Sequence, residues 1–184
     1  MTDTATRTTT SGTTTTTPAP DAALASDIGL LVLRVGFGGL MAAHGAQKLF
    51  GWWGGKGWRD TADGFTAMGY NPGEIFGTLA GLTEFAGGLA LVLGVLTPLA
   101  AAAVLGTMVN AINVTFSGGL LTGKGYEVAL LFAIPAITLA FTGPGRFSLD
   151  HGRPWARQGL VWGVGAVALG VGSGLLTLLL KAVL

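Results

Sequence analysis

The stretch RVGFGGLMAAHGAQKLFG, residues 34–51, places ionisable side chains inside an otherwise apolar run. Arg34, His44 and Lys48 need an explanation, because a charge far from water costs several kcal/mol unless it is paired or hydrated. The apolar run that contains them, residues 27–50, has about the ~20 residues that a helix needs to cross a bilayer. The stretch therefore predicts a membrane-spanning helix with polar groups at several depths.

Composition points to the same class of protein. Half of the 184 residues are hydrophobic and only 10% are charged, against about a quarter charged in an average soluble domain. The formal net charge of +1 provides no basic field for nucleic acid. The absence of cysteine excludes disulfides, thiolate-bound iron–sulfur clusters and thiol redox chemistry by this chain. We expect an integral protein of the cell membrane, with no metal site.

Apolar runs and the breaks between them predict an all-α, polytopic membrane bundle. Residues 1–26 are rich in threonine and poor in large apolar side chains, so we expect a disordered tail. Four core helices are predicted at 27–50, 75–96, 99–116 and 126–142, followed by a polar loop at 143–158 and a fifth membrane helix at 159–181. Five spans place the two termini on opposite sides of the membrane, and the arginines of the polar loop favour a cytoplasmic N-terminus.

Residues 51–74, between the first two predicted helices, differ from the apolar runs. They contain three tryptophans and one tyrosine interleaved with glycine and charged residues. Tryptophan and tyrosine favour the headgroup level because their rings are amphipathic. We expect an interfacial loop with a short amphipathic turn or helix near residues 58–68, in which the tryptophans form an aromatic belt or, alternatively, a substrate platform.

Helix geometry predicts that most of the intramembrane polar groups meet near this loop. With a rise of ~1.5 Å per residue, His44 lies roughly 10 Å from the loop and Glu84 about 15 Å from it. The predicted lining residues of this polar cavity are Arg34, His44, Gln47, Lys48, Glu84, Asn110, Asn113, Tyr126 and Glu127. Arg34 lies deeper, roughly 25 Å from the loop, so it either reaches toward Glu84 or faces a separate pocket.

Each polar residue also has a purely structural interpretation. His44 is a proton relay or a hydrogen-bond donor to a quinone carbonyl, since imidazole titrates near neutral pH, or it bonds a neighbouring helix. Glu84, paired with a basic residue of the first helix, lines an anion or quinone site or only clasps two helices. For Asn110 and Asn113 we expect hydrogen bonds between helices rather than contacts with a ligand. Glu127 is close enough to the interface to be solvated. No catalytic residue is assigned.

Several of these residues also carry a family resemblance. Residues 34–50 contain R-x-x-x-G followed by H-G-x-x-K-L-F, residues 84–94 read E-x-x-G-G-x-x-L-x-x-G, and Tyr126-Glu127 begins the fourth predicted helix. In these segments, over about residues 28–141, the chain resembles the DoxX family of bacterial membrane proteins. The resemblance implies a four-helix membrane domain. Members of this family are described as small subunits of thiosulfate:quinone oxidoreductase and as membrane anchors of oxidative-stress complexes.

The resemblance implies a role in a membrane redox system. The protein is then at most a subunit of a quinone-linked oxidoreductase, with quinone as its candidate ligand. No nicotinamide or flavin fingerprint occurs in the sequence, so no intrinsic cofactor is predicted. The alternatives are a non-enzymatic anchor for a soluble oxidoreductase, and a small transporter or proton pathway. Candidate partners are membrane lipids, a redox partner protein and further copies of the chain.

Overall fold

A computed structural model describes residues 20–184, and most of the tail predicted at 1–26 lies outside this range. The described residues form an all-α fold without strands, which confirms the predicted fold class. The helices are α1 (Pro20–Phe50), α2 (Gly57–Ala67), α3 (Gly73–Leu93), α4 (Thr97–Thr115), α5 (Glu127–Thr142) and α6 (Leu160–Val183), with short 3-10 turns η1 (Trp52–Gly54) and η2 (Phe116–Gly118).

Four of these helices, α1, α3, α4 and α6, are long and apolar enough to cross a membrane. The fourth predicted span became α5, which has only 16 residues and so rises about 24 Å. It begins at Glu127, one residue after the predicted start, and Gly143-Pro144 ends it. The first helix begins at Pro20, seven residues before the predicted start, because proline suits a first helical position and Asp21 complements the helix dipole.

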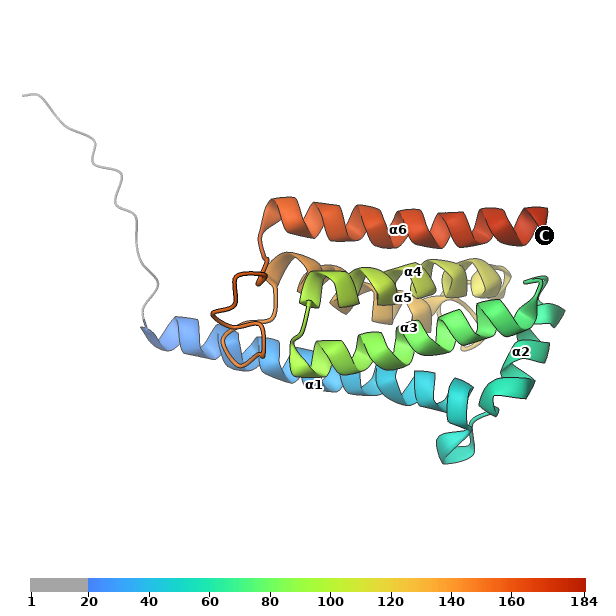
Figure 1. Ribbon diagram of the computed structural model, residues 1–184, viewed down its shortest axis with the longest axis horizontal. Coiled ribbons are helices and arrows are strands. Elements are labelled where there is room, and N and C mark those ends of the chain that lie inside the picture. The colour runs from blue at the N-terminus through green and yellow to red at the C-terminus, as the bar shows by residue number, and fades with distance from the viewer. Residues whose placement is uncertain (1–19) are drawn as a thin grey trace, which may run out of the picture.

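The helices form an elongated bundle (Figure 1). α1, α3, α4, α5 and α6 run along its long axis, and α2 lies across one end. The loop between α5 and α6 lies at the opposite end. α2 confirms the amphipathic helix predicted near residues 58–68. Met41, Leu91, Val104 and Leu139 are almost completely buried, so the core lies where α1, α3, α4 and α5 meet.

Small residues set the closest approaches between helices. A Cβ atom added at Gly88 of α3 would lie 2.4 Å from the backbone nitrogen of Ala42 in α1, and one added at Gly174 of α6 would lie 2.7 Å from Cβ of Val109 in α4. Neither position has room for a side chain, so the backbones approach as closely as in other small-residue membrane interfaces. The fifth predicted membrane helix is therefore packed against α4 as a part of the bundle.

Candidate functional site

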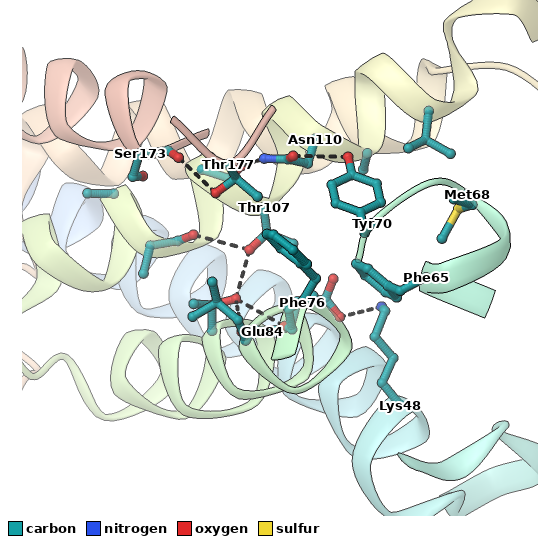
Figure 2. Close-up of a pocket in the computed structure, with 18 of the residues that line it drawn as sticks. Lys48, Phe65, Met68, Tyr70, Phe76, Glu84, Thr107, Asn110, Ser173 and Thr177 are labelled. Carbon is teal, nitrogen blue, oxygen red and sulfur yellow. Dashed lines mark hydrogen bonds and ion pairs between the residues drawn. The ribbon is translucent and has the colours of Figure 1, made fainter. Parts of the chain in front are cut away.

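A cavity of about 480 Å³ lies between α3, α4 and α6, and we call it the membrane groove (Figure 2). α4 contributes the largest set of lining residues, from Leu99 to Thr115, and most of the wall is apolar. α3 contributes residues between Phe76 and Glu84, and α6 contributes Leu169, Ser173 and Thr177. Because Leu79, Leu99 and Leu169 on the rim are exposed, the groove is accessible from the lipid-facing side of the bundle.

One end of the membrane groove carries an ion pair. Lys48 Nζ of α1 lies 2.5 Å from Glu84 Oε2 of α3, and both side chains line the groove. The Glu84 side chain is only 5% exposed, whereas that of Lys48 is 30% exposed. A charge pair in this setting has to be closely matched, because either charge alone would be poorly solvated. This contact confirms that Glu84 has a basic partner on the first helix and identifies that partner as Lys48.

Tyr70 covers the same end of the groove from the segment between α2 and α3. It is almost fully buried, and its hydroxyl donates a 3.0 Å hydrogen bond to Oδ1 of Asn110. Asn110 Nδ2 in turn donates to the carbonyl of Gly174 at 3.1 Å, so this chain of bonds links the α2–α3 segment to α4 and α6. Burial raises the pKa of Tyr70 above its ordinary value, because it disfavours the charged phenolate.

Three aromatic rings with tilted planes form a cluster near the ion pair. The ring centre of Tyr70 lies 5.4 Å from that of Phe65 and 5.4 Å from that of Phe76. All three side chains line the membrane groove. This end of the groove therefore combines a charged donor and a charged acceptor with aromatic side chains.

A second cavity, of about 310 Å³, lies between the end of α1 and α2, and we call it the end pocket. Its wall is more polar and includes His44, Gln47 and Asp60. Lys48 belongs to the walls of both cavities, as do Phe65 and Met68. The Lys48–Glu84 pair therefore stands between a polar pocket at the end of the bundle and an apolar groove along it.

The structure brings together five of the nine predicted cavity residues. Lys48, Glu84 and Asn110 line the membrane groove, and His44 and Gln47 join Lys48 in the end pocket. His44 is nevertheless exposed, with its ring edge-on to Phe132 at 5.5 Å. The single cavity that was predicted is therefore two adjoining cavities in the structure.

The other four predicted residues line neither cavity. Asn113 is exposed on α4, whereas Asn110 before it and Val114 after it line the groove. Tyr126 stacks on Phe116 with ring centres 5.3 Å apart. Glu127 Oε1 accepts a 2.8 Å hydrogen bond from the backbone N–H of Gly123. Tyr126 and Glu127 thus organise the loop before α5.

Arg34, the fourth of these residues, is fully buried at the other end of α3. Its Nη1 donates to the carbonyls of Leu91 and Val92 at 3.3 and 3.2 Å, and its Nη2 donates to the carbonyl of Phe147. A cation at the last turn of a helix is stabilised by the exposed carbonyls and the dipole. Of the two alternatives posed for Arg34, the structure supports a separate site and no pairing with Glu84.

Asp150 completes this second polar cluster and was not singled out from the sequence. It is almost fully buried; its carboxylate accepts hydrogen bonds from the backbone N–H of Thr97 at 3.3 Å and from Trp155 Nε1 at 2.9 Å. Together, Arg34 and Asp150 attach the α5–α6 loop to the turn between α3 and α4. This cluster stabilises the fold at the end opposite the ion pair.

Sequence reasoning also missed part of the groove itself. Tyr70 was treated as an interfacial residue, and Ser173 and Thr177 lie in a helix that was given no role. The hydroxyls at 173 and 177, four residues apart on one helix face, were a signal that this face of α6 contacts something polar or small. Nothing in the local sequence indicates that Tyr70 is buried.

Comparison with known families then bears on the whole arrangement. Residues 29–118 match the family model for DoxX. The protein carries a DoxX domain. With four helices of membrane-spanning length, it is an integral membrane protein. The DoxX domain contains α2, α3, α4 and the part of α1 from residue 29 onward, and it ends before α5, earlier than the predicted limit near 141. α6 supplies one wall of the groove from outside the matched residues. Neither the curated proteins nor the solved structures searched contain a match.

Proposed function

We propose that the membrane groove binds a quinone-class lipid and that the protein thereby serves a membrane redox system. The observation that carries this proposal is the form of the groove: an apolar cavity of about 480 Å³, reachable from the lipid side, that ends at the Lys48–Glu84 pair. Cavities of roughly 300–1,000 Å³ with a few convergent polar groups are typical ligand sites.

The apolar length of the groove suits the tail of such a ligand. Between Leu99 and Gly106, α4 presents alanine, leucine and glycine to the cavity. A hydrocarbon or isoprenoid chain laid along this wall would leave no polar group unsatisfied. A water-soluble substrate of similar size would have to exchange its hydration for apolar contacts, which is unfavourable.

The polar end suits the ring. A quinone has two carbonyl acceptors, and its reduced form has two hydroxyl donors. The ammonium of Lys48 donates and the carboxylate of Glu84 accepts, so the pair offers a complementary group to either redox form. Phe65, which is partly exposed and lines the groove, provides an aromatic face against which a planar head can pack. In this proposal the chain binds and orients the lipid, while electrons are exchanged by a partner oxidoreductase.

The test is direct binding of a short-tailed quinone to the intact protein in mild detergent. Ala103 lines the groove on α4, so Ala103→Phe is expected to block the tail and to weaken binding roughly tenfold, equivalent to about 1.4 kcal/mol. Ala86→Phe is the matched control, because Ala86 is exposed on α3 and lies outside the groove. Equal affinity in the two variants, or no binding by the wild-type protein, would refute the proposal.

The anchor alternative is separated by a second measurement on the same proteins. An anchor recruits its soluble partner through exposed loops, so Ala103→Phe would leave co-purification of an oxidoreductase unchanged. If quinone binding is absent in all variants and a partner still co-purifies, the anchoring role replaces the ligand-binding one.

A further inference from the structure

The α5–α6 loop, residues 143–159, carries most of the unneutralised charge at its end of the bundle. It contains three arginines, Arg146, Arg153 and Arg157, and one acidic residue, Asp150. Asp150 is buried and already accepts hydrogen bonds from Thr97 and Trp155. Its negative charge is therefore directed into the fold, and the guanidinium groups are left on the surface.

Two of the three arginines have no acidic partner among residues 20–184. Arg146 Nε lies 3.8 Å from Asp27 Oδ2. Arg153 instead lies over the ring of Trp155 at 5.7 Å, and Arg157 lies over that of Trp162 at 5.0 Å. Stacking on an aromatic face orients a guanidinium while leaving its N–H groups free to bind an oxyanion.

The loop is held in place rather than extended from the bundle. Backbone N–H groups of Leu149 and Asp150 donate to the carbonyls of Leu93 and Gly94 at 3.1 and 3.0 Å. The buried guanidinium of Arg34 binds the carbonyl of Phe147 from below. The loop lies at the end of the bundle opposite α2 (Figure 1), and these contacts fix its backbone relative to the helix ends.

Exposed apolar side chains surround these cations. Phe147, Leu149 and Trp155 are exposed on the loop, and Trp162 is exposed in the first turn of α6. Tryptophan next to basic residues at the end of a membrane helix lies at the boundary between headgroups and acyl chains. Apolar contact together with phosphate-directed guanidiniums matches the two parts of a phospholipid at this boundary.

We propose that the α5–α6 loop is a binding site for anionic phospholipid, with Arg153 and Arg157 contacting the headgroup phosphate. A protein partner is disfavoured as the occupant, since the apolar side chains lie level with the ends of membrane-spanning helices and are covered by lipid there. Binding of anionic lipid at this loop also favours the orientation in which the loop lies at the cytoplasmic leaflet, which is richer in anionic lipid.

The test compares lipid retention by the full chain in nanodiscs of phosphatidylcholine containing a minor fraction of phosphatidylglycerol. Each basic residue near such a surface contributes about a fivefold preference, so Arg153→Gln/Arg157→Gln is expected to lower the enrichment of phosphatidylglycerol by roughly tenfold or more. The control Arg59→Gln/Lys124→Gln removes the same charge from exposed positions at the opposite end and is expected to lower the enrichment much less, because Asp60 and Asp63 are close to Arg59 in the sequence and offset part of its charge.

Two further arms complete the test. Arg153→Lys/Arg157→Lys keeps the charge and loses the planar fork, so it should retain part of the enrichment and also show that the loop tolerates substitution. Inorganic phosphate added in solution should not displace phosphatidylglycerol, because it lacks the apolar part of the lipid. Enrichment that is unchanged in the glutamine variant, or lost equally in the control, overturns the proposal. Displacement by inorganic phosphate, or capture of a protein in place of lipid, also overturns it.

Discussion

Removing Lys48 should destabilise the protein far more than removing Glu84, although the two side chains form one ion pair. The Glu84 side chain is 5% exposed and faces an apolar groove, so its carboxylate has little access to water once Lys48 is gone. Lys48 is 30% exposed and also lines the end pocket. Without Glu84, its ammonium can turn toward that pocket and be hydrated.

These exposures set the expected magnitudes. Lys48→Met leaves an unpaired buried charge and should lower the free energy of unfolding by about 3–5 kcal/mol. Glu84→Gln should cost about 1 kcal/mol, close to the loss of an exposed pair. The double variant Lys48→Met/Glu84→Gln buries no charge and should recover most of the loss caused by Lys48→Met alone.

The assay is denaturing-detergent unfolding of the purified protein in mixed micelles, followed by circular dichroism, for the wild type and the three variants. The four unfolding free energies form a double-mutant cycle, in which a large coupling energy identifies the pair as interdependent. The reasoning is refuted if Glu84→Gln is as destabilising as Lys48→Met, or if the double variant is no more stable than Lys48→Met.

Three further predictions follow from the helix contacts, from Tyr70 and from the loops. Gly174→Ala should lower the free energy of unfolding by about 1–3 kcal/mol, because the added Cβ would overlap Val109. Gly172→Ala is the control: its added Cβ would have no neighbouring atom within 4 Å, so this variant should be neutral or slightly stabilising in the same unfolding assay. Burial raises the pKa of Tyr70, so the contribution of its neutral hydroxyl to stability should be complete below about pH 10 and be lost as the pH rises through the raised pKa. The melting temperature of Tyr70→Phe should therefore fall less at high pH than that of the wild type, and equal pH profiles of the two proteins would contradict this. If the N-terminus is cytoplasmic, a cysteine at Leu121 should react with an impermeant maleimide added outside intact cells and one at His151 should not; the wild-type chain, which has no cysteine, is the blank.

The depth of each polar residue followed from the sequence, but its direction did not. Lys48 and Glu84 were predicted in the same half of the bundle, and the structure joins them at 2.5 Å. Asn110 and Asn113 were predicted at one level, yet only Asn110 reaches the groove. Depth depends on residue number and helical rise, whereas direction depends on how each helix is rotated about its axis, and the weakly amphipathic α4 carries little signal for that rotation.

For Arg34, too, the sequence indicated the depth of the side chain but not its partners. Its position on the first helix indicated that it lay too deep to be grouped automatically with His44 and Lys48. Its partners are backbone carbonyls of α3 and of the α5–α6 loop. Every residue has a backbone carbonyl, so the sequence does not indicate which carbonyls bind Arg34. The glycines that allow these approaches are visible in the sequence, but the surfaces that they contact are not.

The sequence alone determined the membrane class and the approximate positions of the helices, because apolar runs of spanning length bounded by glycine and proline have few other solutions in a bilayer. It also determined that charges on the first helix require partners, since an unpaired intramembrane charge is costly. Only the tertiary structure decided which partners these are. Lys48 and Arg34 lie 14 positions apart on one helix, about 21 Å; the packing of α3 places a carboxylate beside Lys48 and helix-terminal carbonyls beside Arg34. Close contact between α4 and α6 then completes the groove, which is a property of helix packing that no single segment encodes.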